Sequence, residues 1–193
     1  MALFMSKRET EDYLRRDPDK FIRTLTPEDL SARRCSSPQA YLEMAVASAS
    51  DFTDEEKKKI KFLISKISQY SFTWVFAKAY YEEGLPHTRQ HIIFLSKPCN
   101  IRTLIHERVH VWQKKTGMRV MSPEYTQISI PGVARMRTNP DTNDGKIWSK
   151  NGVICGKFYN SSRPKSIMDC HQYERHPLEE EAYQIALTYG GGA

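Results

Sequence analysis

The stretch from Asn100 to Gly117 constrains the fold of this 193-residue chain more than any other part of the sequence. Asn100 is a good helix N-cap and Gly117 a left-handed stop, so we expect the residues between them to form one helix. On a helical wheel His106, Glu107 and His110 share one polar side, and apolar residues flank that side in both directions. A helix with this pattern is buried on both flanks and directs its polar side into the protein.

The pentamer His106-Glu107-Arg108-Val109-His110 brings metal-binding groups together at a defined spacing. Histidines four positions apart lie on one face of a helix, so both imidazoles can reach one Zn²⁺. The glutamate between them is placed to act as the general base of metal-assisted hydrolysis. The alternative is a surface helix with two exposed histidines, but such a helix would not need apolar residues on both sides of them.

A catalytic zinc usually has three protein ligands and one open position. No histidine occurs between His110 and His171, so the third ligand cannot be a nearby histidine. A metzincin would have Gly and His where this chain has Gln113 and Thr116. The third ligand is therefore expected near the C-terminus.

Pro177 suits the first turn of a second helix, and Glu179 falls on the apolar stripe of that helix. The apolar positions that define the stripe are Leu178, Ala182, Tyr183, Ile185, Ala186 and Tyr189. A carboxylate on a buried stripe needs a partner, and a metal ion is one, so Glu179 is the predicted third ligand. Glu180 and Glu181 project away from the stripe, where acidic residues of a first turn simply favour the helix dipole. Glu180 and His171 remain alternative ligands.

These two segments together resemble the gluzincin branch of the zincin-like metallopeptidases. The residues that carry the resemblance are HERVH at 106–110 and, on the later helix, Pro177, Glu179 and Ala182. The resemblance implies one zinc ion per chain, held by His106, His110 and Glu179. It implies that Glu107 is the catalytic base. It also implies a substrate-binding edge strand beside the active-site helix, a role that Gln90–Ser96 would fill.

A donor that stabilises the oxyanion is expected beside the metal. Tyr173, His171, Tyr125 and Tyr183 are candidates, and the first two are preferred because they precede the ligand helix. His87 stands alone in a predicted loop, and we expect it at the surface. The predicted reaction is hydrolysis of a peptide bond by a zinc-activated water.

The fold expected is α+β: a single zincin-like domain over residues 1–193, with a helical N-terminal part (1–70) and a catalytic part (71–193) that holds a small sheet. The other expected elements are helices beginning near Pro27, Pro38 and Thr53, strands over 72–80 and 90–97, and a hairpin of 146–150 and 153–159 around Asn151-Gly152.

Composition narrows the class of protein further. No run approaches the roughly 18 apolar residues that cross a bilayer, and no secretory signal is present, so we expect an intracellular, cytoplasmic protein without a membrane partner. Four scattered cysteines without a C-x-x-C pair argue against a cysteine metal site. The densest basic run, Lys57–Lys61, is expected on the solvated face of its helix.

Two other functions stay open. The net charge of +6 permits nucleic acid or another anionic partner, so the chain could be an inactive zincin-fold protein that binds through its basic surface. It could also hydrolyse an amide that is not a peptide. The oligomeric state is open.

Overall fold

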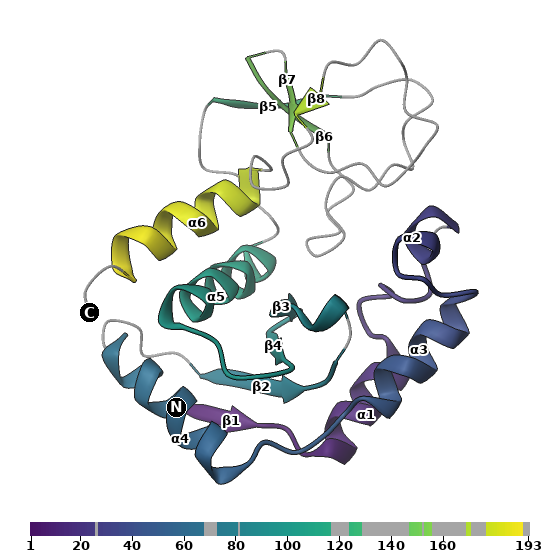
Figure 1. The fold of residues 1–193 in the computed structure, drawn as a ribbon. Coiled ribbons are helices and arrows are strands. Elements are labelled where there is room, and N and C mark those ends of the chain that lie inside the picture. Colours follow the sequence, from purple (N-terminus) through teal and green to yellow (C-terminus); the bar gives the residue numbers. More distant parts are fainter. Residues whose placement is uncertain are drawn as a thin grey trace.

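The computed structural model describes residues 1–25, 27–67, 73–80, 82–116, 124–128, 147–151, 153–155, 169–170 and 177–190. These residues form helices and two small sheets (Figure 1). The expected mixed α+β class is confirmed, whereas its zincin identity and the division at residue 70 stay predictions.

Sheet A is the frame on which the other elements are arranged. Its strands are β1 (Ala2–Phe4), β2 (Trp74–Lys78), β3 (His87–Arg89) and β4 (Ile92–Leu95), in the order β1-β2-β4-β3. β1, β2 and β4 run parallel, and β3 is antiparallel to β4. The prediction that Gln90–Ser96 supplies the edge strand was wrong, because β4 lies between β2 and β3 and the edge strand is β3. A three-residue strand such as β1 or β3 is too short to show alternation in the sequence.

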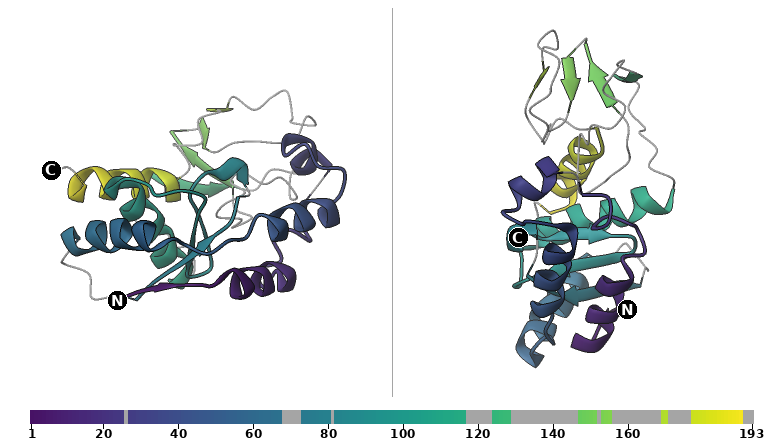
Figure 2. Two further views of the ribbon diagram at one scale, coloured as in Figure 1. Left: turned by 60° about the horizontal axis from the view of Figure 1, so that its bottom comes forward. Right: turned by 90° about the vertical axis from the view of Figure 1, so that its right-hand side faces the viewer.

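Helices cover both faces of sheet A (Figure 2). α1 (Lys7–Arg16) and α3 (Pro38–Ala47) lie on one face of the sheet. The short α2 (Pro27–Ala32) and the 3₁₀ turn η1 (Glu82–Gly84) pack on the same side. α4 (Asp54–Lys66) and α5 (Ile101–Lys115) lie on the other face, and α6 (Pro177–Tyr189) packs along α5. The strands alternate between the two layers: Phe76 and Ile93 face α4 and α5, while Ala77 and Phe94 face α1 and α3.

Helix ends follow the capping signals of the sequence. The Asn100 side chain accepts a 2.9 Å hydrogen bond from the Thr103 amide at the start of α5. Thr53 and Glu56 form a capping box at the start of α4, as expected. Ser37 caps α3, and Pro177 opens α6. These local contacts fix where the two helices of the candidate site begin.

Sheet B is made by β5 (Tyr125–Ile128), β6 (Ile147–Lys150), β7 (Val153–Cys155) and β8 (Asp169–Cys170), in chain order. β6 and β7 form the predicted hairpin, and Asn151 in its turn has a φ of 54°, as favoured hairpin turns require. The expected continuation of this strand to residue 159 lies outside the described residues. Lys150 Nζ lies 3.6 Å from Glu180 Oε1, so an ion pair joins sheet B to α6.

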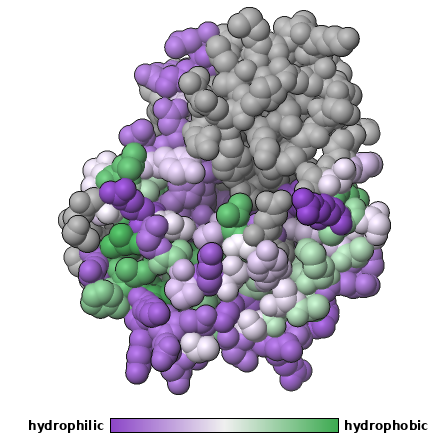
Figure 3. All heavy atoms as spheres, in the orientation of Figure 1, coloured by the Kyte–Doolittle hydropathy of each residue, from purple (hydrophilic) through white to green (hydrophobic). Residues whose placement is uncertain are grey.

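On the face of the molecule that Figure 3 shows, the described residues are mostly hydrophilic, with apolar side chains scattered among them. Lys58, Lys59 and Lys61 on α4 are exposed, as predicted for a solvated face, and a nucleic-acid partner stays a prediction. Among the described residues, every helix is too short or too polar to cross a membrane.

Candidate metal centre

The candidate centre lies between α5 and α6, which pack along each other. His106 and His110 lie one turn apart on α5, and Glu179 lies in the first turn of α6. The close approach depends on Gly190 after α6, because a Cβ there would lie 2.5 Å from Arg102 Cγ. The side chain of Glu179 is only 1% exposed, so the predicted buried carboxylate is confirmed.

Two imidazole nitrogens and the two oxygens of one carboxylate converge at this point. His106 Nε2 lies 3.1 Å from Glu179 Oε2, and His110 Nε2 lies 3.2 Å from Glu179 Oε1. The two Nε2 atoms are 3.0 Å apart. Within the part of the chain that the structure describes, these residues form the one group of this kind that could hold a metal ion.

The spacing fits a single small cation. With metal–ligand distances of about 2.0–2.1 Å, neighbouring ligands of a tetrahedral site lie about 3.3 Å apart, close to the three distances observed. Hydrogen bonds have similar lengths. If each Nε2–H donated to its own Glu179 oxygen, the 3.0 Å contact between the two nitrogens would have no hydrogen bond, whereas one cation contacts both nitrogens and the carboxylate. The donor set therefore fits a metal ion better than a proton.

The electrostatics of the site follow from this clustering. Burial disfavours the charged carboxylate of Glu179, but His110 and His106 outweigh it and hold its pKa well below the usual range. Burial likewise opposes the charged form of His110, yet the Glu179 carboxylate raises the pKa of His110 to about 9. The site thus stabilises positive charge at the place where the three ligand atoms meet.

The other two acidic residues in the first turn of α6 have partners away from the candidate centre. Glu180 faces Lys150 of sheet B, as described above. Glu181 Oε2 accepts a 2.8 Å hydrogen bond from Gln113 Nε2. Glu180 and Glu181 are only partly buried, in line with the expectation that they project away from the apolar stripe, and Gln113 is long enough to reach Glu181 there. His171 lies outside the described residues.

Glu107 is buried beside the candidate ligands, and a residue of sheet A binds its side chain. Thr88 Oγ1 donates a 2.8 Å hydrogen bond to Glu107 Oε2 and lies 3.0 Å from the Glu107 carbonyl oxygen. Burial raises the pKa of Glu107, and the nearby histidines and Thr88 partly offset that effect. Thr88 pairs with Ile93 in the sheet, so both face α5. The Thr88 carbonyl accepts a 2.5 Å hydrogen bond from Lys114 Nζ, which ties the edge strand to the same helix.

The candidate oxyanion donors are only partly covered by the structure. Tyr183 lies beside the site, with its ring centroid 4.6 Å from that of His106. Tyr125 lies on β5, with Lys150 Nζ 5.2 Å from its ring centroid. The preferred candidates, Tyr173 and His171, lie outside the described residues. Of the four, Tyr183 is the one whose contact with a ligand residue is established.

The expectation that His87 lies at the surface was wrong, since it is 2% exposed on β3. In a strand, alternate residues face opposite sides, so His87 and Arg89 face away from α5 while Thr88 faces towards it. The His87 ring stacks on Phe94, with centroids 5.3 Å apart. Burial, reinforced by Arg89, lowers the pKa of His87 to about 3. Neither the burial of His87 nor that of Arg89 was predicted from the sequence, because no local signal marks a three-residue strand.

Beyond Arg89 lies a buried ion pair. Arg33 Nη2 lies 2.9 Å from Glu82 Oε2, and Arg33 Nε donates a 3.0 Å hydrogen bond to Glu82 Oε1. The Tyr41 hydroxyl also bonds to Glu82. Burial opposes ionisation of Glu82, but Arg89 and Arg33 lower its pKa to about 2. This cluster faces the α1 and α3 side of sheet A and is separate from the candidate metal centre.

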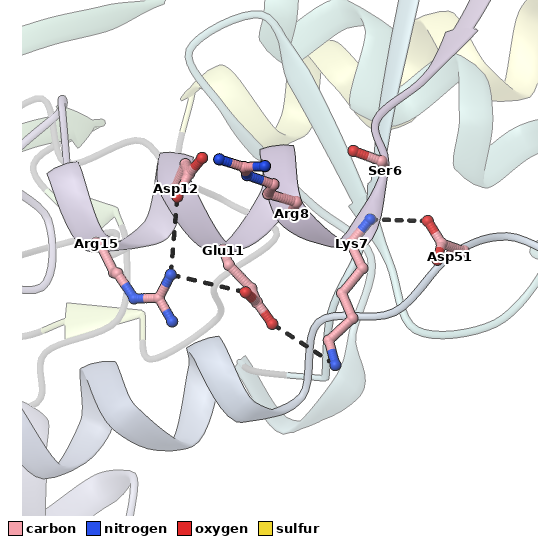
Figure 4. Close-up of a pocket in the computed structure, with 7 residues that line it drawn as sticks. All are labelled: Ser6, Lys7, Arg8, Glu11, Asp12, Arg15 and Asp51. Atoms are coloured by element: carbon pink, nitrogen blue, oxygen red, sulfur yellow. Dashed lines mark hydrogen bonds and ion pairs between the residues drawn. The ribbon is translucent and has the colours of Figure 1, made fainter.

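A pocket of about 510 Å³ lies on α1, on the face of sheet A opposite α5 (Figure 4). Its charged side chains largely pair with one another. Glu11 lies 3.7 Å from Lys7 Nζ and 3.6 Å from an Arg15 nitrogen, and the Lys7 amide donates a 2.8 Å hydrogen bond to Asp51. This pairing balances the charges of the pocket internally and gives it no chemistry comparable with that of the ligand triad.

Comparisons of this chain with protein-family models, with curated proteins and with solved structures find no match.

Proposed function

We propose that this protein is a zinc-dependent peptidase, with the metal held by His106, His110 and Glu179. The observation that carries the proposal is the convergence of two imidazole Nε2 atoms and one buried carboxylate within 3.0–3.2 Å of one another. Zinc is favoured because two histidines and a glutamate at near-tetrahedral spacing are ligands that it prefers. When bound, zinc would activate a water molecule and polarise the substrate carbonyl.

The other residues of the site support hydrolysis. Glu107 would accept a proton from the attacking water and return it to the leaving amine. Burial raises the pKa of Glu107, which makes its carboxylate a stronger base. The hydrogen bond from Thr88 holds Oε2 of that carboxylate and leaves Oε1 for the water. Tyr183, beside His106, is the donor that we assign to the developing oxyanion.

The proposal is tested by two measurements on the purified, untagged protein. Mass spectrometry of the metal content should give about one zinc per chain, lost in His106→Ala. A peptide library should be cleaved by the wild-type protein. Glu107→Gln should keep its zinc and lose at least about a hundredfold in cleavage rate. Glu55→Gln, which alters an exposed glutamate of α4, is the matched control and should cleave like the wild type.

Three results would contradict parts of the proposal. A protein that takes up no zinc even when zinc is added has no such metal centre. Cleavage that persists in Glu107→Gln removes the assigned base. Zinc binding with hydrolysis of simple amides but not of peptides would change the substrate class and leave the centre intact.

A further inference from the structure

Gln113 lies one turn beyond His110 on α5, and its side chain joins both ligand helices. It is fully buried. Its Oε1 lies 2.8 Å from His110 Nδ1. Its Nε2 donates to the Leu178 carbonyl at 2.9 Å and to Glu181 Oε2 at 2.8 Å. The amide of Gln113 therefore contacts one predicted metal ligand on α5 and, on α6, a residue on each side of Glu179 in the sequence.

The partners of Gln113 fix the orientation of its amide. A carbonyl and a carboxylate can only accept hydrogen bonds, so they must face the amide nitrogen of Gln113. The amide oxygen must then face His110 Nδ1, and Nδ1 must carry the hydrogen. In a neutral imidazole this leaves the lone pair on Nε2, the atom that points to His106 and Glu179. The hydrogen-bond network thus sets the tautomer that a metal needs.

The same amide holds the second helix in register. Leu178 and Glu181 lie on either side of Glu179 in the first turn of α6, and both are bound by the amide nitrogen of Gln113. A shift of α6 along α5 would break these bonds at the same time as it moved the Glu179 carboxylate. The position of the third ligand is therefore coupled to the residue that orients the second.

We propose that Gln113 is the positioning residue of the metal centre, presenting His110 Nε2 to the metal and fastening α6, with Glu179, to α5. This inference rests on the proposed zinc site, and it assigns no contact between Gln113 and the metal. Partners of this kind typically contribute a factor of about 10 to 100 in metal affinity.

The test is zinc affinity, measured by competition with a chromogenic chelator. Gln113→Met keeps the length of the side chain and removes all three hydrogen bonds, and it should weaken zinc binding about 10- to 100-fold. Glu181→Ala removes one of the two hydrogen bonds that join Gln113 to α6 and leaves the bond to His110, and it should weaken zinc binding about 3- to 10-fold. Gln184→Met, at an exposed position of α6, is the matched control and should be unchanged.

A second readout separates positioning from simple loss of stability. In the zinc-loaded wild type and in Gln184→Met, the His110 Nδ1 hydrogen should be visible by proton NMR and protected from exchange. In Gln113→Met it should exchange rapidly with water. If Gln113→Met does not fold, Glu181→Ala carries the test, and a folded Glu181→Ala that binds zinc as tightly as the wild type overturns the inference.

The possible failures are distinguishable. Equal zinc affinity in the wild type and a folded Gln113→Met refutes the role of Gln113 and leaves the proposed peptidase untouched. A wild type that binds no zinc refutes the proposed function, and the positioning role falls with it.

Discussion

Replacing His87 by glutamine should make the protein less sensitive to acid. His87 is buried against Phe94 on β3, and its Nδ1 lies 2.8 Å from the Leu85 carbonyl, which a neutral imidazole can donate to. Burial first, and then the nearby charge of Arg89, lower its pKa to about 3, while Glu82 acts in the opposite direction and Lys114 adds to the lowering. The folded protein therefore holds His87 neutral at pH values where an unfolded chain would protonate it.

The sign and size of the effect follow by linkage. The unfolded state takes up a proton below a pKa of about 6.5, and the folded state does so only below about 3. Stability is therefore lost as the pH falls from about 6.5 towards 3, at about 1.4 kcal/mol per pH unit. Between pH 7 and pH 5 the contribution of His87 amounts to about 2 kcal/mol of the free energy of unfolding.

The assay is urea unfolding followed by tryptophan fluorescence at pH 7, 6 and 5. The free energy of unfolding of the wild type, relative to His87→Gln, should fall by about 2 kcal/mol across this range. Only the pH dependence of the difference matters, because the substitution also alters packing at every pH. His91→Gln, at an exposed position four residues on, is the control for the loss of an imidazole at the surface. A difference for His87→Gln that stays constant within about 0.3 kcal/mol would refute the reasoning.

Two further predictions concern Glu82 and Thr88. Glu82→Gln removes the carboxylate that pairs with buried Arg33 and Arg89, so it should cost about 3–5 kcal/mol in urea unfolding at pH 7, and a loss below about 1 kcal/mol would contradict the ion pair. Because the pKa of Glu82 is lowered to about 2, its stabilisation should be lost as the pH falls from about 4.5 through 2. Thr88→Val should leave the zinc content unchanged and lower the peptide cleavage rate about 10- to 100-fold, because it removes the hydrogen bond to Glu107. Thr88→Ser keeps the hydroxyl and should cleave at close to the wild-type rate. Equal cleavage rates in the two variants would show that Thr88 does not position the base.

The parts of the site that could be predicted from the sequence depend on local signals. Asn100 and Pro177 mark the starts of α5 and α6, and each helix then fixes which residues share a face. That is enough to place His106 and His110 together. It also places Glu179 on a buried stripe, because the stripe repeats with the helical period.

Helical periodicity did not show how much of each apolar face is covered. Tyr183 and Tyr189 were placed on the inward face of α6, yet they are 41% and 52% exposed. Trp112, one of the apolar residues that flank the polar side of α5 and were expected to be buried, is 43% exposed. A wheel gives direction around a helix, but coverage depends on the neighbouring elements. The small residues Ala182 and Ala186 make the close contact instead, since they let α6 approach α5.

Contacts between distant segments were also beyond the sequence. The bond between Thr88 and Glu107 requires knowing that residues 87–89 form a strand and that Thr88 faces α5. The Arg33–Glu82 pair joins positions 49 apart on segments with no shared pattern. Gln113 entered the sequence analysis only as the residue that stands where a metzincin has glycine, because its partners on α6 lie far away in the sequence. Each of these residues has an ordinary local environment and gains its role from packing.

The long insert between α5 and α6 does little to weaken the site. His106 and Glu179 are 73 positions apart, but doubling the length of such a loop costs only about 0.6 kcal/mol. Leaving a buried carboxylate without its partner costs about 3–5 kcal/mol, several times more. A chain that needed only a stable contact between the two helices would gain more from an apolar side chain at position 179, such as those of Leu178 and Ala182 beside it. Burying a carboxylate at this position costs free energy that an apolar side chain would not cost. The carboxylate faces two imidazoles, an arrangement that suits a cation, and this favours a metal centre over a purely structural cluster.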